Sequence, residues 1–165
     1  RCAPGLPRPA PGAGAAEADV TGCTCLSMHQ PWASLLVAGI KRVEGRSWST
    51  AHRGHLWIAS TARLPAPDEI AEIEGAYAAR AEAAGNPAPC FPDAYPPSAL
   101  LGCVRVADCV PNEAFEERFP HLDKEDNCSA LLLVVDEPRR LSVPFRHSGD
   151  RKLYPLDTQV AARAR

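Results

Sequence analysis

The stretch Gly39-Ile40-Lys41-Arg42-Val43-Glu44-Gly45-Arg46 decides how this sequence is interpreted, because it leads from a helical pattern into an extended one and carries several charges. Glu44 and Arg46 are two residues apart and project from the same face of a strand, with Lys41 at the mouth of that strand. A carboxylate between a lysine and an arginine stays ionised and is held by charge-assisted hydrogen bonds. The stretch therefore predicts a preorganised polar pocket, with a purely structural ion pair as the alternative.

A strand and a short helix are expected before this stretch, and two strands within and after it. Residues 23–28 predict the first strand. Pro31 stands where the first helical position needs no N–H, the apolar residues that follow recur at helical spacing, and Gly39 supplies a left-handed C-cap. The later strands cover residues 42–48 and 54–60, and their proximity in the chain predicts that they pair as a hairpin.

The C-terminal half alternates helices with apolar strands. A helix begins at Pro67, with acids in its first turn, and stops at Gly85. The remaining elements are a central strand, a short helix and two strands separated by a turn at 136–138, expected over residues 100–110, 113–118, 131–135 and 141–145. Strands interrupted by two or three flanking helices predict an α+β domain whose sheet, of about five or six strands, curls into a β-barrel.

One domain accounts for most of the 165 residues. Residues 1–22 consist mainly of Ala, Pro and Gly and lack the apolar side chains that would offset the entropy of ordering, so they predict a disordered linker. The domain is expected over residues 23–160, followed by a flexible tail at 161–165. The longest aliphatic run, Leu131 to Val135, is far too short to cross a bilayer, so no membrane span is expected.

The charged residues are segregated along the chain, although the formal net charge is only −2. Residues 41–63 and 139–165 are basic, whereas residues 68–82 and 113–126 are acidic. The two basic segments predict a positive surface for a polyanion if they share a face, and separate solvated faces if they do not. No cofactor is expected, and no metal, because the single Cys-x-Cys pair has no second pair at zinc-finger spacing.

The pattern Gly-x-Lys-x-x-Glu-x-Arg over residues 39–46, preceded by Gln30-Pro31-Trp32-Ala33, resembles the signature of the ASCH family. Similarity to that family extends through residues 25–37, 52–59 and 101–104. The resemblance implies a barrel similar to that of PUA domains. It also implies a nucleic-acid-binding module of a transcription coactivator, in the nucleus or shuttling to the cytoplasm. DNA or RNA is then the expected partner, together with proteins of coactivator complexes.

The resemblance further implies which residues line a basic cleft beside the signature. Lys41 and Arg53 suit phosphate contacts. Glu44 can accept a hydrogen bond from an exocyclic amine, and Gln30 can read a base edge. Trp48 is expected either to stack on a base or to pack in the core. The candidate nucleic-acid-binding residues are Ser27, Gln30, Pro31, Lys41, Glu44, Arg46, Trp48, His52, Arg53 and Lys152.

Two other classes of function stay open at this point. Some ASCH proteins hydrolyse the amide of acylated cytidine with a threonine nucleophile, but that position is Glu44 here, so the mechanism does not carry over. Other members are ribonucleases whose activity is attributed to a Lys, a Tyr and a Ser, and Lys41 with Ser27 supplies two of the three. A protein-interaction scaffold would use the acidic helices at 68–82 and 113–117 as docking faces. The motif favours binding over catalysis, so no catalytic residue is assigned.

Overall fold

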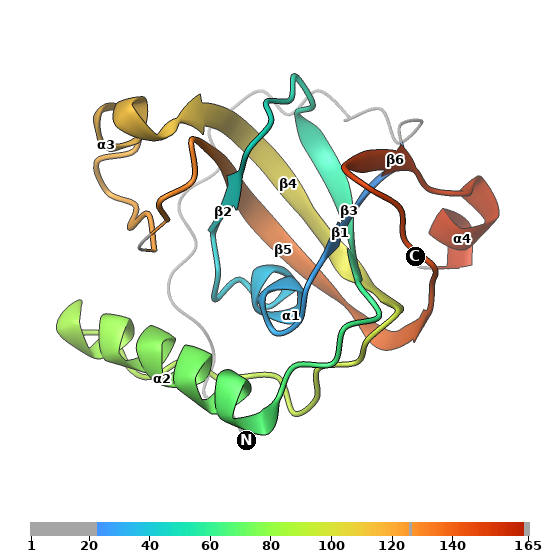
Figure 1. The fold of residues 1–165 in the computed structure, drawn as a ribbon, viewed down its shortest axis with the longest axis horizontal. Helices are drawn as coiled ribbons and strands as arrows, with labels where there is room; N and C mark the ends of the chain where they lie inside the picture. The colour runs from blue at the N-terminus through green and yellow to red at the C-terminus, as the bar shows by residue number, and fades with distance from the viewer. Residues whose placement is uncertain (1–22, 126, 164–165) are drawn as a thin grey trace.

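The computed structural model describes residues 23–125 and 127–163 of the chain, so the predicted linker at 1–22 lies outside the described residues. Figure 1 shows a curled sheet with helices on its inner and outer sides. The strands are β1 (Thr24–Met28), β2 (Val43–Arg46), β3 (Gly54–Ser60), β4 (Ala99–Pro111), β5 (Leu131–Arg146) and β6 (Leu153–Pro155). The helices are α1 (Trp32–Val37), α2 (Pro67–Ala83), α3 (Phe115–Arg118) and α4 (Thr158–Arg163), with a 3-10 turn at Asn112–Ala114.

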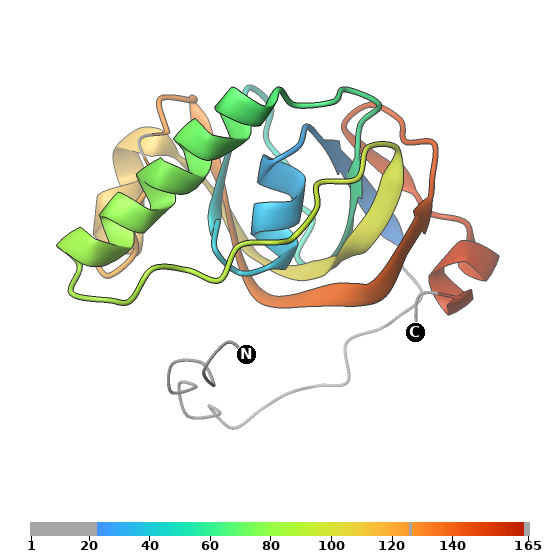
Figure 2. The ribbon, with the colours of Figure 1, turned by 90° about the horizontal axis from the view of Figure 1, so that it is seen from below.

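All six strands belong to one sheet, in the order β2-β5-β4-β3-β1-β6. Neighbouring strands are antiparallel except β1 and β3, which run parallel with Cys25 opposite Trp57. The sheet curls into a half-barrel around α1, and α2 flanks its open side (Figures 1 and 2). The predicted α+β class with a curled sheet is therefore confirmed. The described part of the chain has four α-helices, where two or three were expected.

The predicted hairpin between residues 42–48 and 54–60 is wrong. β2 pairs antiparallel with β5, so that Val43 lies opposite Val134, whereas β3 lies between β4 and β1. Val43 is completely buried in an apolar cluster with Val134 and Phe115. Burial of each strand's apolar face therefore decides the pairing, and proximity along the chain does not.

The predicted turn at residues 136–138 is also wrong, because the chain continues through it as the single long strand β5. Glu137 has a positive φ of 46°, and the register between β4 and β5 shifts between Cys103 and Arg105. The extra residues are absorbed as β-bulges, which bend a strand without reversing it. The bent strand can thus pair with β2 at its start and with β4 along most of its length.

Alternation along β1 separates the two faces of the sheet. Leu26 and Met28 point into the half-barrel and pack with the apolar side of α1. Cys25 is buried on the outer face together with Ala161 of α4, a helix that extends into the segment expected to be a tail. Ser27 therefore also lies on the outer face. Within the described ranges, every helix is too short or too polar to span a bilayer.

Candidate functional site

The end of α1 places Lys41 at the entrance of β2. Gly39 has a φ of 75°, and its N–H donates to the Leu36 carbonyl oxygen at 3.1 Å. The N–H groups of Ile40 and Lys41 both donate to the Leu35 carbonyl oxygen, at 3.0 and 3.1 Å. The predicted glycine C-cap is thus confirmed. It turns the chain so that the Lys41 side chain enters the fold, where only 5% of it is exposed.

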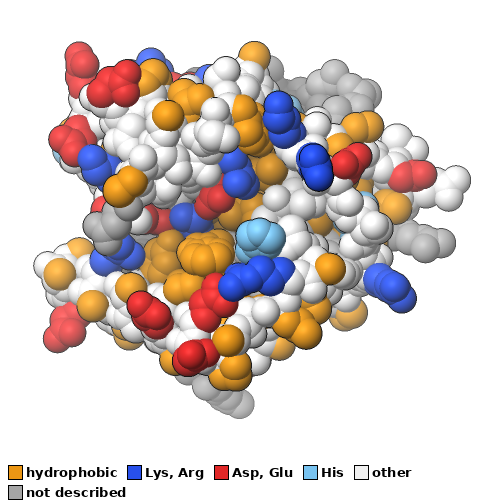
Figure 3. All heavy atoms as spheres, in the orientation of Figure 1, with side chains coloured by type: hydrophobic (Ala, Val, Ile, Leu, Met, Phe, Trp, Pro, Cys, Tyr) orange, Lys and Arg blue, Asp and Glu red, His pale blue; other side chains and the backbone are white. Residues whose placement is uncertain are grey.

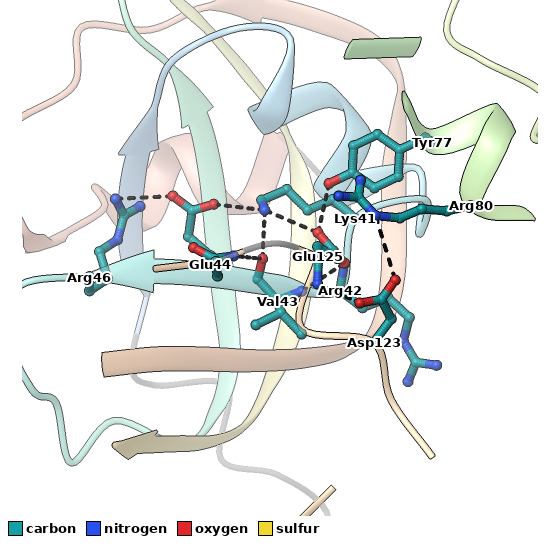
Figure 4. Close-up of polar contacts among 10 residues, drawn as sticks. Lys41, Arg42, Val43, Glu44, Arg46, Tyr77, Arg80, Asp123 and Glu125 are labelled. Atoms are coloured by element: carbon teal, nitrogen blue, oxygen red, sulfur yellow. Dashed lines mark hydrogen bonds and ion pairs between the residues drawn. The ribbon is translucent and has the colours of Figure 1, made fainter. Parts of the chain in front are cut away.

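Three acceptors surround the Lys41 ammonium group (Figure 4). Lys41 Nζ donates to the Val43 carbonyl oxygen at 2.5 Å and lies 3.1 Å from Glu125 Oε2 and 3.3 Å from Glu44 Oε2. An ammonium group has three N–H donors, so each donor has an acceptor. Lys41 is therefore a buried cation whose charge is already neutralised.

Glu125, from the loop between α3 and β5, holds this arrangement together and was not predicted. Its Oε1 accepts the backbone N–H groups of Arg42 at 2.6 Å and Val43 at 3.2 Å. Its Oε2 accepts the Tyr77 hydroxyl at 2.6 Å in addition to Lys41. Burial, and then the charge of Glu125, raises the pKa of Tyr77 well above its ordinary value, so the phenol stays a neutral donor. One carboxylate thereby joins this loop, β2 and α2.

Glu44 faces Arg46 as well as Lys41, as expected for residues two apart on a strand. Glu44 Oε1 lies 3.1 Å from Arg46 Nη1, and the Arg46 guanidinium carbon lies 5.9 Å from the centre of the Trp48 ring. Trp48 itself packs against the main core cluster, which is the second of its two expected roles. Arg46 Nε and Nη2 are buried and make no hydrogen bond within the described residues. The network thus combines a structural ion pair with two guanidinium nitrogens of Arg46 that have no hydrogen-bond acceptor among the described residues.

A cleft of about 360 Å³ opens beside this network. Figure 3 shows a hollow on this face of the molecule, where acidic and basic side chains lie beside apolar surface. Its volume is in the range of small-ligand sites. The lining residues are Trp32 of α1, Lys41, Glu44 and Gly45 of the signature, Ile73, Ala76, Tyr77 and Arg80 of α2, and Glu125, Asn127 and Cys128 of the loop before β5.

The charges of the cleft balance one another, so the expectation of a basic cleft is not met. The lining holds two cations, Lys41 and Arg80, and two carboxylates, Glu44 and Glu125. Arg80 lies over the Tyr77 ring at 5.4 Å, with its Nε 3.5 Å from Asp123 Oδ2 at the rim. The cleft is therefore polar and aromatic, and suits a neutral ring better than a free anion.

Gln30 and Pro31, both predicted as contact residues, are buried. Gln30 Nε2 donates to Ser34 Oγ at 2.7 Å and to the Pro96 carbonyl oxygen at 3.0 Å, and its Oε1 accepts the Ser34 N–H at 3.1 Å. Pro31 precedes α1 as its N-cap residue. Gln30 thus joins the start of α1 to the loop over residues 84–98, and because its side chain is completely buried it does not reach a base edge.

His52 and Arg53 lie in the loop between β2 and β3 and do not line the cleft. His52 Nε2 lies 2.9 Å from the His55 carbonyl oxygen. Arg53 Nη2 lies 2.5 Å from Asp108 Oδ1, and Arg118 Nη2 lies 2.5 Å from the other oxygen of the same carboxylate. Arg53 is half-exposed, but its charge is shared with a carboxylate and does not face the cleft residues.

Ser27 belongs to a second polar cluster, on the outer side of the half-barrel. Ser27 Oγ lies 3.0 Å from the Tyr154 hydroxyl oxygen, which lies 3.2 Å from His147 Nε2. Lys152 is exposed in the loop between β5 and β6. The structure therefore does not bring Ser27 to Lys41, and these two residues do not form a Lys-Tyr-Ser constellation in the cleft.

The model of the ASCH domain family matches residues 26–139, and the chain belongs to the ASCH domain family. Activating signal cointegrator 1 of Mus musculus and that of Homo sapiens are each 45% identical to it over 139 residues. These alignments cover 84% of this chain and 23% of either relative, so the chain spans a minor part of their length. The solved structure of ASCH from Zymomonas mobilis is 12% identical, with 85% of this chain and 91% of that chain covered and a TM-score of 0.49.

Proposed function

We propose that this chain is a nucleic-acid-binding module that takes an unpaired base of a DNA or RNA strand into the cleft between α2 and β2. The observation that carries the proposal is the combination of an aromatic wall with a buried carboxylate in one cleft. Trp32 and Tyr77 line it beside Glu44, whose side chain is 14% exposed. Proteins that bind single strands stack bases on aromatic side chains and hydrogen-bond their edges.

Glu44 is the residue proposed to accept a hydrogen bond from an exocyclic amine. Its two oxygens already face Lys41 at 3.3 Å and Arg46 at 3.1 Å. Each carboxylate oxygen can accept two hydrogen bonds, so capacity for a base amine remains. The two cations hold the Glu44 carboxylate in one place, which preorganises the acceptor.

Lys41 acts in this proposal as a positioning residue and not as a phosphate ligand. Its ammonium group is surrounded by Glu44, Glu125 and a carbonyl oxygen. A phosphate in the same place would meet two carboxylates at close range, and like charges repel. The cleft therefore favours the base part of a nucleotide over its phosphate.

The similarity to activating signal cointegrator 1 supports placing this module in a coactivator-like protein. Such a protein would work in the nucleus or shuttle to the cytoplasm, with proteins of coactivator complexes as further partners. The acidic helices at 68–82 and 113–117 would serve as docking surfaces for those partners. The base-binding cleft would supply the contact with nucleic acid.

The test is fluorescence anisotropy with single-stranded and duplex oligonucleotides of DNA and RNA. We expect single strands to bind more tightly than duplexes, because a paired base does not reach the cleft. Glu44→Gln should weaken binding about 10- to 150-fold, since a hydrogen bond to a charged group contributes about 1.5–3 kcal/mol. Glu113→Gln, the same change at an exposed residue away from the cleft, is the matched control.

A second variant separates loss of binding from loss of folding. Ala76 is exposed on α2 and lines the cleft without joining the ion pairs. Ala76→Trp should fill the cleft and abolish binding while the melting temperature stays near that of the wild type. The proposal fails if the wild type binds no oligonucleotide at low salt, or if both cleft variants bind like the Glu113→Gln control.

A further inference from the structure

Lys41 and Arg46 of the ASCH signature are paired with carboxylates, as are the arginines of the neighbouring loops, whereas Arg42 is exposed and makes no ion pair among the described residues. These pairings leave open where a bound strand would place its phosphates. Lys41 is paired with two glutamates, and Arg53 with Asp108. Arg63 makes a two-pronged contact with Glu69 at 2.9 and 2.8 Å. Arg105 is paired with Asp136 and Glu137. A phosphate needs cations that are not already committed to carboxylates.

Further unpaired cations occur in the β5–β6 segment, defined as the last residue of β5 and the connection to β6, residues 146–152. Arg146, Arg151 and Lys152 are exposed, and none takes part in an ion pair among the residues described. The only carboxylate in the segment is that of Asp150, and its Oδ1 accepts the Arg151 backbone N–H at 2.7 Å. The segment therefore carries an excess of positive charge.

Tyr154 fixes the shape of this segment. Its hydroxyl contacts Ser27 Oγ at 3.0 Å and His147 Nε2 at 3.2 Å, and the His147 and Tyr154 rings stack with centroids 6.1 Å apart. Gly149 lies so close to Ser27 that an added Cβ would overlap its Oγ. The basic side chains thus stand on a loop that is anchored on both sides, which lowers the entropy lost when a ligand binds.

The segment packs on the outer face of β1 and reaches the margin of the open side of the half-barrel (Figures 1 and 2). Figures 1 and 2 show the connection from β5 to β6 at one margin of the open side of the half-barrel, with α2 at the other and α1 between them. A strand whose base occupies the cleft can therefore run across the open side towards this segment. The positive charge of the segment and its place at the margin of the open side both fit the phosphate backbone of that strand.

We infer that the β5–β6 segment, with Arg146, Arg151 and Lys152, binds the sugar-phosphate backbone of the same single strand whose base enters the cleft. The inference rests on the proposed function and assigns its electrostatic part to residues outside the ASCH signature. Ser27 has a positioning role here through Tyr154, and Lys152 is a direct phosphate ligand.

The experiment compares two variants that each remove two positive charges. Arg151→Gln with Lys152→Asn changes the segment, and Asn tolerates the positive φ of 55° at position 152. Arg139→Gln with Arg140→Gln is the matched control, because both arginines are exposed and Arg140 lines a different groove with Val37 and Asp93. Binding of a single-stranded oligonucleotide and of an abasic strand of equal length is measured across a salt series.

The slope of log affinity against log salt should fall by about 1.4 in the segment variant, because each lost phosphate contact in a single strand removes about 0.7. The control and Glu44→Gln should keep the wild-type slope. The abasic strand should bind more weakly than the normal strand and still respond to the segment variant.

Equal slopes in the segment variant and its control overturn this inference while the base-binding cleft stands. Abasic and normal strands of equal affinity overturn the cleft while the segment stands, and absence of binding to either strand overturns both.

Discussion

Glu125→Gln most directly perturbs the charge network around Lys41. The substitution keeps the shape of the side chain, removes its charge and replaces one acceptor oxygen with an NH₂ donor. Only 7% of the Glu125 side chain is exposed. One oxygen faces Lys41 and Tyr77, and the other faces two backbone N–H groups. The amide nitrogen of Gln therefore meets hydrogen-bond donors in either orientation.

The expected loss of stability follows from two ion pairs of Lys41: the pair with Glu125 breaks, and the pair with Glu44 remains. Removing one partner of a buried ion pair costs about 3–5 kcal/mol when the other charge is left alone. Glu44 still lies 3.3 Å from Lys41 Nζ, so the lower end of that range applies. We expect the free energy of unfolding to fall by about 3 kcal/mol. For a domain of this size the melting temperature should then fall by roughly 6–12 °C.

Urea unfolding followed by tryptophan fluorescence measures this loss. Glu116→Gln is the control, because the Glu116 side chain is 79% exposed and only forms a surface pair with Lys124 at 3.1 Å. An exposed pair contributes about 0–1 kcal/mol, so the control should unfold close to the wild type. If Glu125→Gln unfolds at the same urea concentration as Glu116→Gln, the role assigned to Glu125 is refuted.

Three further substitutions probe the surroundings of the cleft and the second cluster. Gly45→Ala should destabilise the domain by about 1–3 kcal/mol in thermal unfolding, because its Cβ would overlap Asn127 Oδ1. Gln30→Ala should cost about 1–3 kcal/mol and increase proteolysis within residues 84–98, because the Pro96 carbonyl oxygen loses one of its two donors and keeps only the Ser60 hydroxyl. Burial lowers the pKa of His147 below its ordinary value of 6.5. The unfolded chain therefore binds the proton more readily than the folded chain, so the free energy of unfolding decreases as the pH falls from 6.5 through the pKa of the folded state. A His147→Asn variant should show a flatter dependence of melting temperature on pH in that window.

Each of these expectations has an outcome that contradicts it. Gly75→Ala has open space on α2, so equal melting temperatures for the two glycine variants would remove the packing argument at Gly45. Unchanged proteolysis in Gln30→Ala would mean that other contacts hold the loop. An identical pH profile for His147→Asn would mean that another group titrates.

Local signals predicted most of the elements but not their partners. The helix from Pro67 was identified from its apolar spacing and its end signals, and the Gly39 C-cap from a single glycine after a periodic run. The pairing of β2 with β5 depends on burial against residues about ninety positions away, which no local pattern records. The bend at Glu137 contains turn-forming residues, and only the continuous ladder with β4 shows that the chain does not reverse there.

In the candidate site, too, the local features were predicted and the long-range contacts were not. The spacing of Glu44 and Arg46 predicted that they face one another, and they do. Glu125 was counted only as one of the acids of residues 113–126, with no role at the site. Its contact with Lys41 spans 84 positions, so the neutralisation of that lysine was invisible in the sequence. Charge counted along the chain left a positive surface open and the family resemblance implied a basic cleft, whereas the charged residues that line the cleft balance one another.

Photo-crosslinking tests the central claim, that a base enters the cleft, most directly. A single-stranded RNA carrying 5-iodouridine is irradiated with the wild-type chain, and the crosslinked peptides are identified by mass spectrometry. We predict crosslinks at Trp32 or Tyr77, the aromatic residues of the cleft, and their loss in Ala76→Trp. Crosslinks found only outside the cleft lining, or unchanged in Ala76→Trp, would contradict the account.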